Sequence, residues 1–567
     1  MLFHALKDEG TTDYILQTTL VLHFEPKEDL LRLAANALSR RYDALRTAIL
    51  YEGMSKPRQV VLKERLPDYS AFDYSYMTSD EAEAAVSALR RREVSNGFDL
   101  QKQPLLRFCQ IKLPGNVYKL VWTMHHIIVD GWCMSLLQVD LLRYYELLLE
   151  GMALDQLDAL IQRERLENTE YSRYVKWLEK QDANRALTYW ENRLTGYSDD
   201  ATVRPFEEPK SSPLQMCCKS DSLRPETVRR LKDLSKNNQI TMGTILQTAW
   251  GLLLQGYQGS EDIVFGKVVS GRNAPISGIE RVIGLFANTV PVRVARQSKQ
   301  SILELLKLEQ KHSLESDQYS HCSLAEIQTR VGVSKLMSTL FAFENYSVSK
   351  DYTDKYSCMI TQEHSREQTN FDLTLSAYEE GLSLHYELLY DPNRYSERNI
   401  QYISSHYQSL LDRIAQFPME AVDTVSLITT EEQEQILGSF NQTKWNCKKD
   451  RTIAQILETW VSLSPHKIAL VDGEERFSYD AMNRRINSLA WKLKELGVQR
   501  GDLVAILPRR GWRTIVAVCA ILKAGAAYVP IDPGYPEQRI RDILEDCDPK
   551  AILTYDCRVE SEKPTLE

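Results

Sequence analysis

The sequence predicts an α/β protein, because stretches with strand periodicity alternate with stretches of helical periodicity. Residues 14–24 alternate apolar and polar positions, and residues 28–42 then repeat apolar positions at helical spacing. The same order returns near the C-terminus, where four such stretches lie between residues 503 and 546. Strands and helices in alternation favour layered α/β units. The apolar face of the first strand consists of Tyr14, Leu16, Leu20, Leu22 and Phe24.

Composition narrows the class of protein. The 567 residues are 43% hydrophobic and 26% charged, which is ordinary for globular domains and is enough for about three or four of them. Lys and Arg number 69 against 78 Asp and Glu, a net charge of −9, so nothing in the charge favours nucleic-acid binding. The ten cysteines are scattered without Cys-x-x-Cys pairs, which predicts a cytoplasmic location. Neither a signal peptide nor a membrane span is predicted.

A pair of histidines follows a predicted hairpin. Residues 105–113 and 117–124 form its strands, and Pro114-Gly115-Asn116 forms the turn. A helix is predicted over 134–149, so the run from His125 to Trp132 lies between a strand and a helix. If the strand alternation continues, His126 points with the large apolar residues and His125 points to the opposite face.

Adjacent histidines on a strand diverge, so they do not favour a shared metal ion, and no metal site is predicted. One imidazole can serve as a base or as a hydrogen-bond partner. The structural alternative is that His126 is a buried histidine bonded to a carbonyl and Asp130 caps the following helix. The residues alone leave both interpretations open.

The middle of the chain predicts a second α/β region. A helix is expected over 245–254, and strands over 262–269 and 384–390. Glycines in the segments Phe265–Arg272 and Ile283–Thr289 are expected to allow close backbone approach or a tight turn. Beyond a linker, the C-terminal stretches predict strands and helices in a doubly wound arrangement, at 503–507, 512–524, 527–531 and 537–546.

The run His-His-x-x-x-Asp-Gly-Trp at 125–132 resembles the signature of the condensation domains of nonribosomal peptide synthetases. Residues 41–47 are similar to a second motif of that family, with Tyr42 and Asp43 as departures. Residues 170–177, 265–272 and 283–289 resemble further family motifs. Phe477–Asp480 and Leu522–Pro533 resemble the first two motifs of an amino-acid adenylation domain.

The resemblance implies an α/β (α+β sandwich) fold of two lobes similar to chloramphenicol acetyltransferase, arranged as a V-shaped pseudo-dimer, followed by a truncated doubly wound α/β adenylation subdomain. The expected boundaries are 1–178 for the N-lobe, 179–430 for the C-lobe, 431–449 for a linker and 450–567 for the partial adenylation domain. The aromatic residues of 170–177 are expected to pack near the crossover between the lobes.

The resemblance also assigns roles to residues. His126 is the expected catalytic residue, acting as a base or by positioning the amine, and His125 supports it. Asp130 is expected to pair with Arg46, because a partly buried carboxylate needs a partner. Gly131 is expected where a substrate arm passes close to the backbone. Three further residues are expected to line the channel, namely Ser270, Arg272 and Asn288.

The implied reaction joins a donor aminoacyl or peptidyl thioester to the α-amine of an acceptor aminoacyl thioester. No cofactor is expected to bind directly, since both substrates would arrive on phosphopantetheine arms of upstream and downstream carrier proteins of the assembly line. ATP and Mg²⁺ would be used only by a complete adenylation domain, whose later motifs are not found in 450–567. The alternatives are a non-catalytic docking module, an acyl-CoA-dependent acyltransferase of the same superfamily and a stand-alone adenylating ligase.

Overall fold

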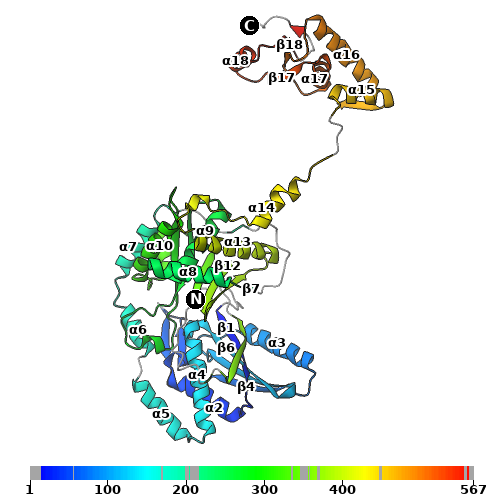
Figure 1. The fold of residues 1–567 in the computed structure, drawn as a ribbon. Helices are drawn as coiled ribbons and strands as arrows, with labels where there is room; N and C mark the ends of the chain where they lie inside the picture. The colour runs from blue at the N-terminus through cyan, green and yellow to red at the C-terminus, as the bar shows by residue number, and fades with distance from the viewer. Residues whose placement is uncertain are drawn as a thin grey trace. The chain divides into compact units, whose positions relative to one another are not determined.

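The computed structural model describes residues 14–54, 57–167, 170–197, 203–204, 216–333, 336–344, 356, 358–366, 371–445, 450–554 and 559–560. The chain divides into two compact units, Met1–Gln435 and Ile436–Glu567 (Figure 1). Each unit has its own hydrophobic core. In the part of the chain that is described, no helix is long and apolar enough to cross a membrane.

The first lobe is built on a five-stranded sheet with the order β11-β1-β6-β5-β4. Its strands are β1 (Ile15–Leu22), β4 (Asp68–Asp73), β5 (Leu106–Leu113), β6 (Val117–His125) and β11 (Ile360–Arg366). A separate pair, β2 (Thr47–Leu50) and β3 (Arg58–Val61), lies outside this sheet. The helices are α2 (Glu28–Arg41), α3 (Ser79–Ser95), α4 (Gly131–Leu149) and α5 (Leu154–Glu167).

Alternation along β6 divides the core of this lobe between two faces of the sheet. Trp122 and Met124 pack in the cluster that includes α2 and α4. Val121 points to the other face, where it packs with apolar residues of α3. Both faces are covered, so the strand that leads to the histidines is almost entirely buried.

The second lobe contains a six-stranded sheet with the order β7-β13-β12-β10-β8-β9. Its strands are β7 (Cys217–Ser222), β8 (Asp262–Val269), β9 (Asn288–Ala295), β10 (Thr339–Glu344), β12 (Leu373–Glu380) and β13 (Ser383–Tyr390). One face packs on α8 (Pro225–Asn238), α9 (Met242–Gln258), α10 (Ile302–Asp317) and α13 (Glu397–Gln416). The other face packs on α7 (Ala183–Leu194) and α11 (Leu324–Val331).

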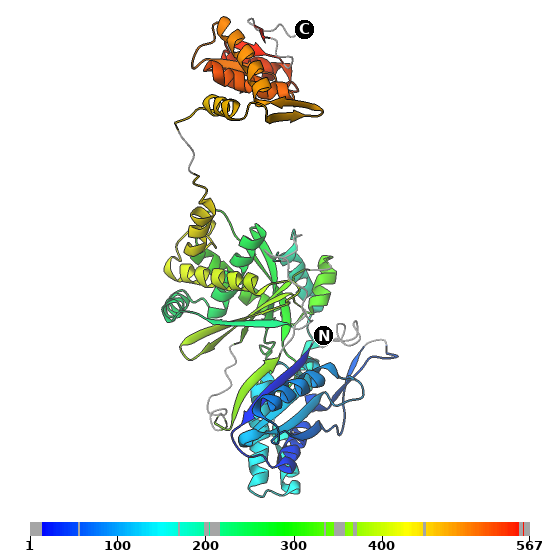
Figure 2. The ribbon, with the colours of Figure 1, turned by 90° about the vertical axis from the view of Figure 1, so that its right-hand side faces the viewer.

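Strand β11 crosses between the lobes. It lies in the chain between β10 and β12 of the second sheet, yet it pairs antiparallel with β1 of the first sheet. Figure 2 shows it in light green beside the blue strand β1. The predicted boundary at 178/179 therefore does not hold for residues 360–366, because non-local strand pairing leaves no mark in the local sequence pattern.

Several predicted elements coincide with the structure. The strand over 262–269 and the helix over 512–524 have the predicted bounds. The hairpin turn has Gly115 at φ +74° and Asn116 at +59°, which explains the turn residues there. Helix α4 begins at Gly131, three residues before the predicted start. The family motif at 170–177 overlaps helix α6 (Tyr171–Leu178). Tyr174 of this helix packs 4.5 Å from Phe286 of the second lobe, ring centre to ring centre.

The second unit has a small parallel sheet with helices on both faces. Strands β17 (Ala527–Pro530), β16 (Leu503–Ile506) and β18 (Ala551–Leu553) run parallel, and β19 (Val559–Glu560) is antiparallel to β18. Helices α16 (Tyr479–Glu495) and α17 (Trp512–Ala524) pack on one face, and α18 (Glu537–Cys547) packs on the other. This is the predicted doubly wound arrangement. The unit also contains α15 (Ile453–Leu463) and the hairpin β14 (Ile468–Asp472) and β15 (Glu475–Ser478).

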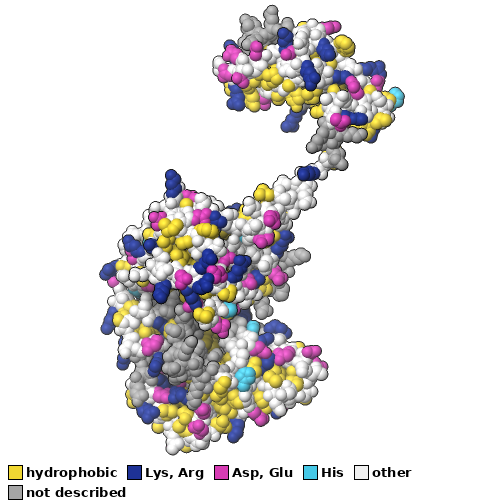
Figure 3. Space-filling view, viewed as in Figure 1, with side chains coloured by type: hydrophobic (Ala, Val, Ile, Leu, Met, Phe, Trp, Pro, Cys, Tyr) yellow, Lys and Arg dark blue, Asp and Glu magenta, His cyan; other side chains and the backbone are white. Residues whose placement is uncertain are grey.

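The surface of the first unit carries charges of both signs. Figure 3 shows basic and acidic side chains interspersed on the visible face.

Helix α14 (Thr430–Leu437) lies at the start of the predicted linker, where Glu432 bonds to His406 of α13 at 2.7 Å.

Candidate active site

The two histidines lie where strand β6 gives way to a 3₁₀ turn. His125 ends the strand, and His126 begins the turn His126–Ile128. The strand alternation therefore stops before His126, and the predicted opposite orientation of the two rings does not follow from it. Both side chains are buried, with 4% and 8% of their surface exposed.

His125 is held as a neutral, structural histidine. Its Nδ1 accepts a hydrogen bond from the Ile127 N–H at 3.1 Å, and its backbone N–H donates to the Leu105 carbonyl at 3.0 Å. Burial, followed by the nearby His126, lowers the pKa of His125 to about 4. The ring thus supports the loop and is uncharged near neutral pH.

His126 is anchored through its backbone. Its N–H donates to the Tyr14 carbonyl at 2.7 Å, and its carbonyl accepts from the Val129 N–H at 3.3 Å. One histidine is thus tied to the segment before β5 through Leu105 and the other to the segment that begins β1. These backbone bonds fix the position of His126.

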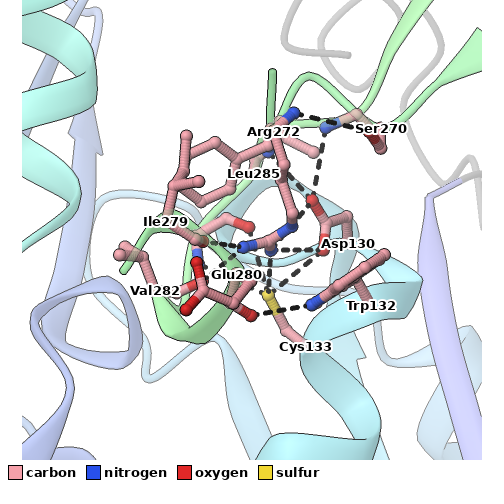
Figure 4. A network of polar contacts seen from close by, with 12 residues as sticks. Asp130, Trp132, Cys133, Ser270, Arg272, Ile279, Glu280, Val282 and Leu285 are labelled. Atoms are coloured by element: carbon pink, nitrogen blue, oxygen red, sulfur yellow. Dashed lines mark hydrogen bonds and ion pairs between the residues drawn. The ribbon is translucent and has the colours of Figure 1, made fainter. Parts of the chain in front are cut away.

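Asp130 precedes the first residue of α4, but its carboxylate does not cap that helix. It reaches into the second lobe, where Oδ2 accepts from the N–H groups of Phe286 at 3.0 Å and Ala287 at 3.3 Å. Oδ1 accepts from Arg272 Nη2 at 3.1 Å (Figure 4). The predicted pairing with Arg46 is therefore wrong, and the partner of Asp130 is Arg272.

Arg46 has a different set of partners, all in the first lobe. Its Nη2 donates to Asp43, three residues before it in the chain, and its Nε donates to the Ser39 carbonyl at 2.8 Å. Its Nη1 donates to the carbonyls of Leu62 and Lys63. The guanidinium joins the end of α2 to the segment after β3. The departure at position 43 supplies its acidic partner.

Arg272 is buried, and its two Nη atoms bond to groups of both lobes. Nη1 donates to the carbonyls of Ile279 at 2.7 Å and Val282 at 2.9 Å, while Nη2 faces Asp130. The guanidinium also lies 4.2 Å from the centre of the Phe286 ring. The pairing of Arg272 with Asp130 was not predicted from the sequence, where Arg272 was expected to line the channel.

Cys133 completes the network around Asp130, and no pattern in the sequence pointed to this role. Its buried Sγ lies 3.1 Å from Asp130 Oδ1, 3.3 Å from the Gly284 carbonyl and 3.3 Å from Arg272 Nη2. Burial, and then the charge of Asp130, raise the pKa of this thiol, so it stays protonated. The neighbouring Trp132 also reaches the second lobe, where Nε1 donates to the Glu280 carbonyl at 2.9 Å.

The remaining predicted residues lie around this network. Gly131 is the first residue of α4, directly after Asp130. Ser270 accepts a hydrogen bond from the Arg272 N–H at 3.4 Å. Asn288 donates to the carbonyls of Ser320 and Cys322, at 2.8 and 2.6 Å, so its amide stabilises the second lobe. That these side chains line a channel stays a prediction.

Two glycines permit the close approach of the segments, as predicted. Gly271 has φ +65°, and a Cβ there would lie 2.0 Å from the Phe286 carbonyl oxygen. A Cβ on Gly284 would lie 2.2 Å from the Tyr171 ring. The hydroxyl of that tyrosine donates to the Leu285 carbonyl at 2.5 Å.

Among the residues that the structure describes, no group of three or more His, Cys, Asp or Glu side chains could hold a metal ion.

Comparisons with known proteins identify the family of each unit. A family model of the condensation domain matches residues 1–437, and a model of the AMP-binding enzyme matches residues 457–567. The chain therefore belongs to the condensation-domain family of nonribosomal peptide synthetases, with part of an AMP-binding domain following.

Similar curated proteins are much longer than this chain. Tyrocidine synthase 3 of Brevibacillus parabrevis is 36% identical over 562 residues, covering 98% of this chain and 8% of the relative. Bacitracin synthase 1 of Bacillus licheniformis is 31% identical over 563 residues, covering 98% and 10%. The chain thus spans about a tenth or less of the length of these two relatives.

Solved structures show the same fold. A four-domain nonribosomal peptide synthetase bound to AMP and glycine has a TM-score of 0.74 at 18% identity, over 96% of this chain and 42% of that one. The first condensation domain of the calcium-dependent antibiotic synthetase, in complex with a substrate analogue, has a TM-score of 0.58 at 16% identity, over 76% and 97%.

Proposed function

We propose that the first unit forms an amide bond between a donor aminoacyl or peptidyl thioester and the α-amine of an acceptor aminoacyl thioester. Both substrates would be presented on phosphopantetheine arms by upstream and downstream carrier proteins of an assembly line. The observation that carries the proposal is the fixed loop. His126 is anchored to Tyr14 on one side, and Asp130 is bonded to the second lobe on the other.

In the proposed reaction, the amine nitrogen attacks the donor thioester carbon and forms a tetrahedral intermediate. The carbon–sulfur bond then breaks, and the proton lost by the nitrogen ends on the departing sulfur. His126 hydrogen-bonds to the attacking amine, which orients the lone pair and relays the proton. His125 does not compete for that proton, because its pKa is about 4.

Asp130 and Arg272 act on this reaction by fixing the loop. Both side chains are buried and bonded to each other, and together they bond to four backbone groups of the second lobe. The charges are satisfied within the protein, so neither one is available to bind substrate. We assign them to positioning.

The proposal also covers the second unit and the location of the protein in the cell. Residues 457–567 match an AMP-binding enzyme, and a complete domain of that kind would use ATP and Mg²⁺. The eight described cysteines are free thiols, which fits the proposed cytoplasmic location.

The test is single-turnover peptide formation on carrier proteins loaded with a panel of aminoacyl groups, followed by mass spectrometry of the intact carriers. The wild-type chain should form dipeptidyl carrier, and His126→Ala should lower the rate by about 10²–10⁴-fold. His385→Ala is the matched control, since His385 lies on β13, with 30% of its side chain exposed.

The alternatives give different results. A docking module would bind both carriers and form no product with the wild-type chain. An acyl-CoA-dependent acyltransferase would transfer acyl groups from acyl-CoA to the acceptor carrier and leave a loaded donor carrier unused. Either result would overturn the proposed reaction.

A further inference from the structure

The backbone of His126 is tied to an unusual residue. Tyr14, whose carbonyl accepts the His126 N–H at 2.7 Å, has φ +62°, in the left-handed region that a tyrosine rarely adopts. A conformation of this kind persists only where surrounding contacts impose it, and such residues cluster at functional sites. The neighbouring contacts should therefore identify what holds Tyr14 in place.

Ile15, the residue after Tyr14, is held by β11, the strand that crosses from the second lobe. Arg366, the last residue of β11, donates from Nη1 to the Ile15 carbonyl at 3.2 Å. In the sheet register, Arg366 lies opposite Gln17 of β1, and Ile15 lies opposite His125 of β6. The guanidinium thus reaches the end of β1 that meets the histidines.

The crossing strand is itself fixed to the first lobe by a buried lysine. Lys119 of β6 has Nζ 2.7 Å from Glu363 of β11 and 2.7 Å from Glu83 of α3. The side chain of Lys119 is 3% exposed, so both ion pairs are strengthened by burial at the lysine.

A β-bulge in β11 directs the Glu363 carboxylate toward Lys119. Thr19 pairs with His364 and Leu20 pairs with Gln362, which leaves Glu363 as the extra residue of β11. Bulges re-aim side chains and shift the register of the residues beyond them. The bulge therefore sets both the Glu363 contact with Lys119 and the position of Arg366 three residues later.

We propose that Arg366 is a positioning residue for His126, acting through Ile15 and Tyr14, and that β11 thereby makes the position of the histidine depend on the second lobe. The proposal rests on the proposed function only in naming His126 as the reacting group. The chain of contacts is Arg366 to the Ile15 carbonyl, then the adjoining Tyr14 carbonyl to the His126 N–H.

The test uses the full chain with Arg366→Met, Arg366→Lys and the control Ser365→Ala. Ser365 is exposed and is the neighbour of Arg366 on the strand, so its side chain points to the other face. Amide hydrogen exchange of the peptide that contains His126 reports its bond to Tyr14 whether or not the chain is active. Single-turnover rates on loaded carriers report the chemistry.

Arg366→Met should raise exchange at the His126 amide by about tenfold. It should also lower the rate at saturating carrier by about tenfold, with the carrier concentration for half-maximal rate unchanged. Arg366→Lys should recover part of both losses, and Ser365→Ala should change neither.

Unchanged exchange in folded Arg366→Met would overturn the proposal. If that variant does not fold, two milder variants decide the question. Arg366→Lys weakens the bond to the Ile15 carbonyl, and Glu363→Gln weakens the ion pair with Lys119 that holds β11. Unchanged exchange in both would count against the proposal. Absence of product from the wild-type chain would contradict the proposed function instead, while the exchange measurement would still decide the role of Arg366.

Discussion

Asp130 of the first lobe and Arg272 of the second lobe form a buried ion pair, with 3.1 Å between Oδ1 and Nη2 and 4% of each side chain exposed. The two residues are separated by 142 positions in the chain. The carboxylate of Asp130 also accepts hydrogen bonds from the backbone N–H groups of Phe286 and Ala287 in the second lobe. Its contact within the first lobe is with the Cys133 thiol. The loop that carries the histidines is thus built by both lobes.

A double-mutant cycle should locate the partner of Asp130. Arg272→Met should lower the free energy of unfolding by about 3–5 kcal/mol, because it leaves a buried carboxylate without its charge partner. Combining it with Asp130→Asn should recover part of that loss. The measurement is urea-induced unfolding of the four proteins of the cycle.

Arg46→Met serves as the matched control for that cycle. It should also destabilise the protein, since it removes donors from three backbone carbonyls and Asp43. Its effect should add to that of Asp130→Asn without coupling. A coupling energy above about 1 kcal/mol between Arg46 and Asp130 would contradict the observed pairing.

Gly271 and Gly259 should respond differently to alanine. Both have φ +65°, but a Cβ on Gly259 would meet no atom within 4 Å, whereas one on Gly271 would lie 2.0 Å from the Phe286 carbonyl oxygen. Gly259→Ala should cost about 1–2 kcal/mol from backbone conformation alone. Gly271→Ala should cost at least about 1–3 kcal/mol more, from the clash. Equal melting temperatures for the two variants would show that the segments separate easily.

Stability should fall as the pH is lowered through the range set by His125. Its pKa is about 4 in the folded chain and 6.5 for an unperturbed histidine, so the unfolded chain binds the proton more tightly. The contribution is fully present above pH 6.5 and is lost as the pH falls toward 4. It amounts to about 3 kcal/mol.

His125→Asn offers a control, because an amide oxygen can accept the Ile127 N–H without titrating in this range. Urea unfolding at intervals between pH 4 and 7 should give a shallower pH dependence for this variant than for the wild type. Parallel curves would assign the pH dependence to other groups.

Cys133 should tolerate serine better than valine. Serine keeps a donor beside Asp130 and the Gly284 carbonyl, so the change should stay within about 1 kcal/mol. Valine removes the donor from a buried carboxylate and should cost about 1–3 kcal/mol. Thermal unfolding of the two variants side by side provides the measurement, and a more stable valine variant would mean that the thiol acts only by filling space.

Local patterns predicted most elements and the loop that bears the histidines. The strand that ends at His125 and the helix that follows Asp130 both depend on periodicity within about 20 residues, which the sequence displays directly. Motifs at 265–272 and 283–289 also pointed to the segments that enclose the loop. Glycines 271 and 284 were interpreted correctly, since close approach leaves the residue type as its mark.

The predicted partner of Asp130 was wrong, because the residues of this ion pair are far apart in the sequence. An arginine that faces Asp130 was expected, but sequence alone could not choose between Arg46 and Arg272. The acid at position 43 was an available signal, because it stands three residues before Arg46 and can neutralise it locally. The positions of Tyr14 and Arg366 had no comparable signal, since backbone conformation and strand crossing are set by the tertiary structure.

The crossing strand has a consequence for synthesis of the protein. When a ribosome has released the chain up to residue 178, β1 still lacks its neighbour β11, which is encoded about 340 positions after it. The nascent first lobe then has an open sheet edge and an uncompensated Asp130, both of which favour association with other chains. Newly made protein should therefore depend on protection by chaperones until residues 360–366 emerge and pair with β1.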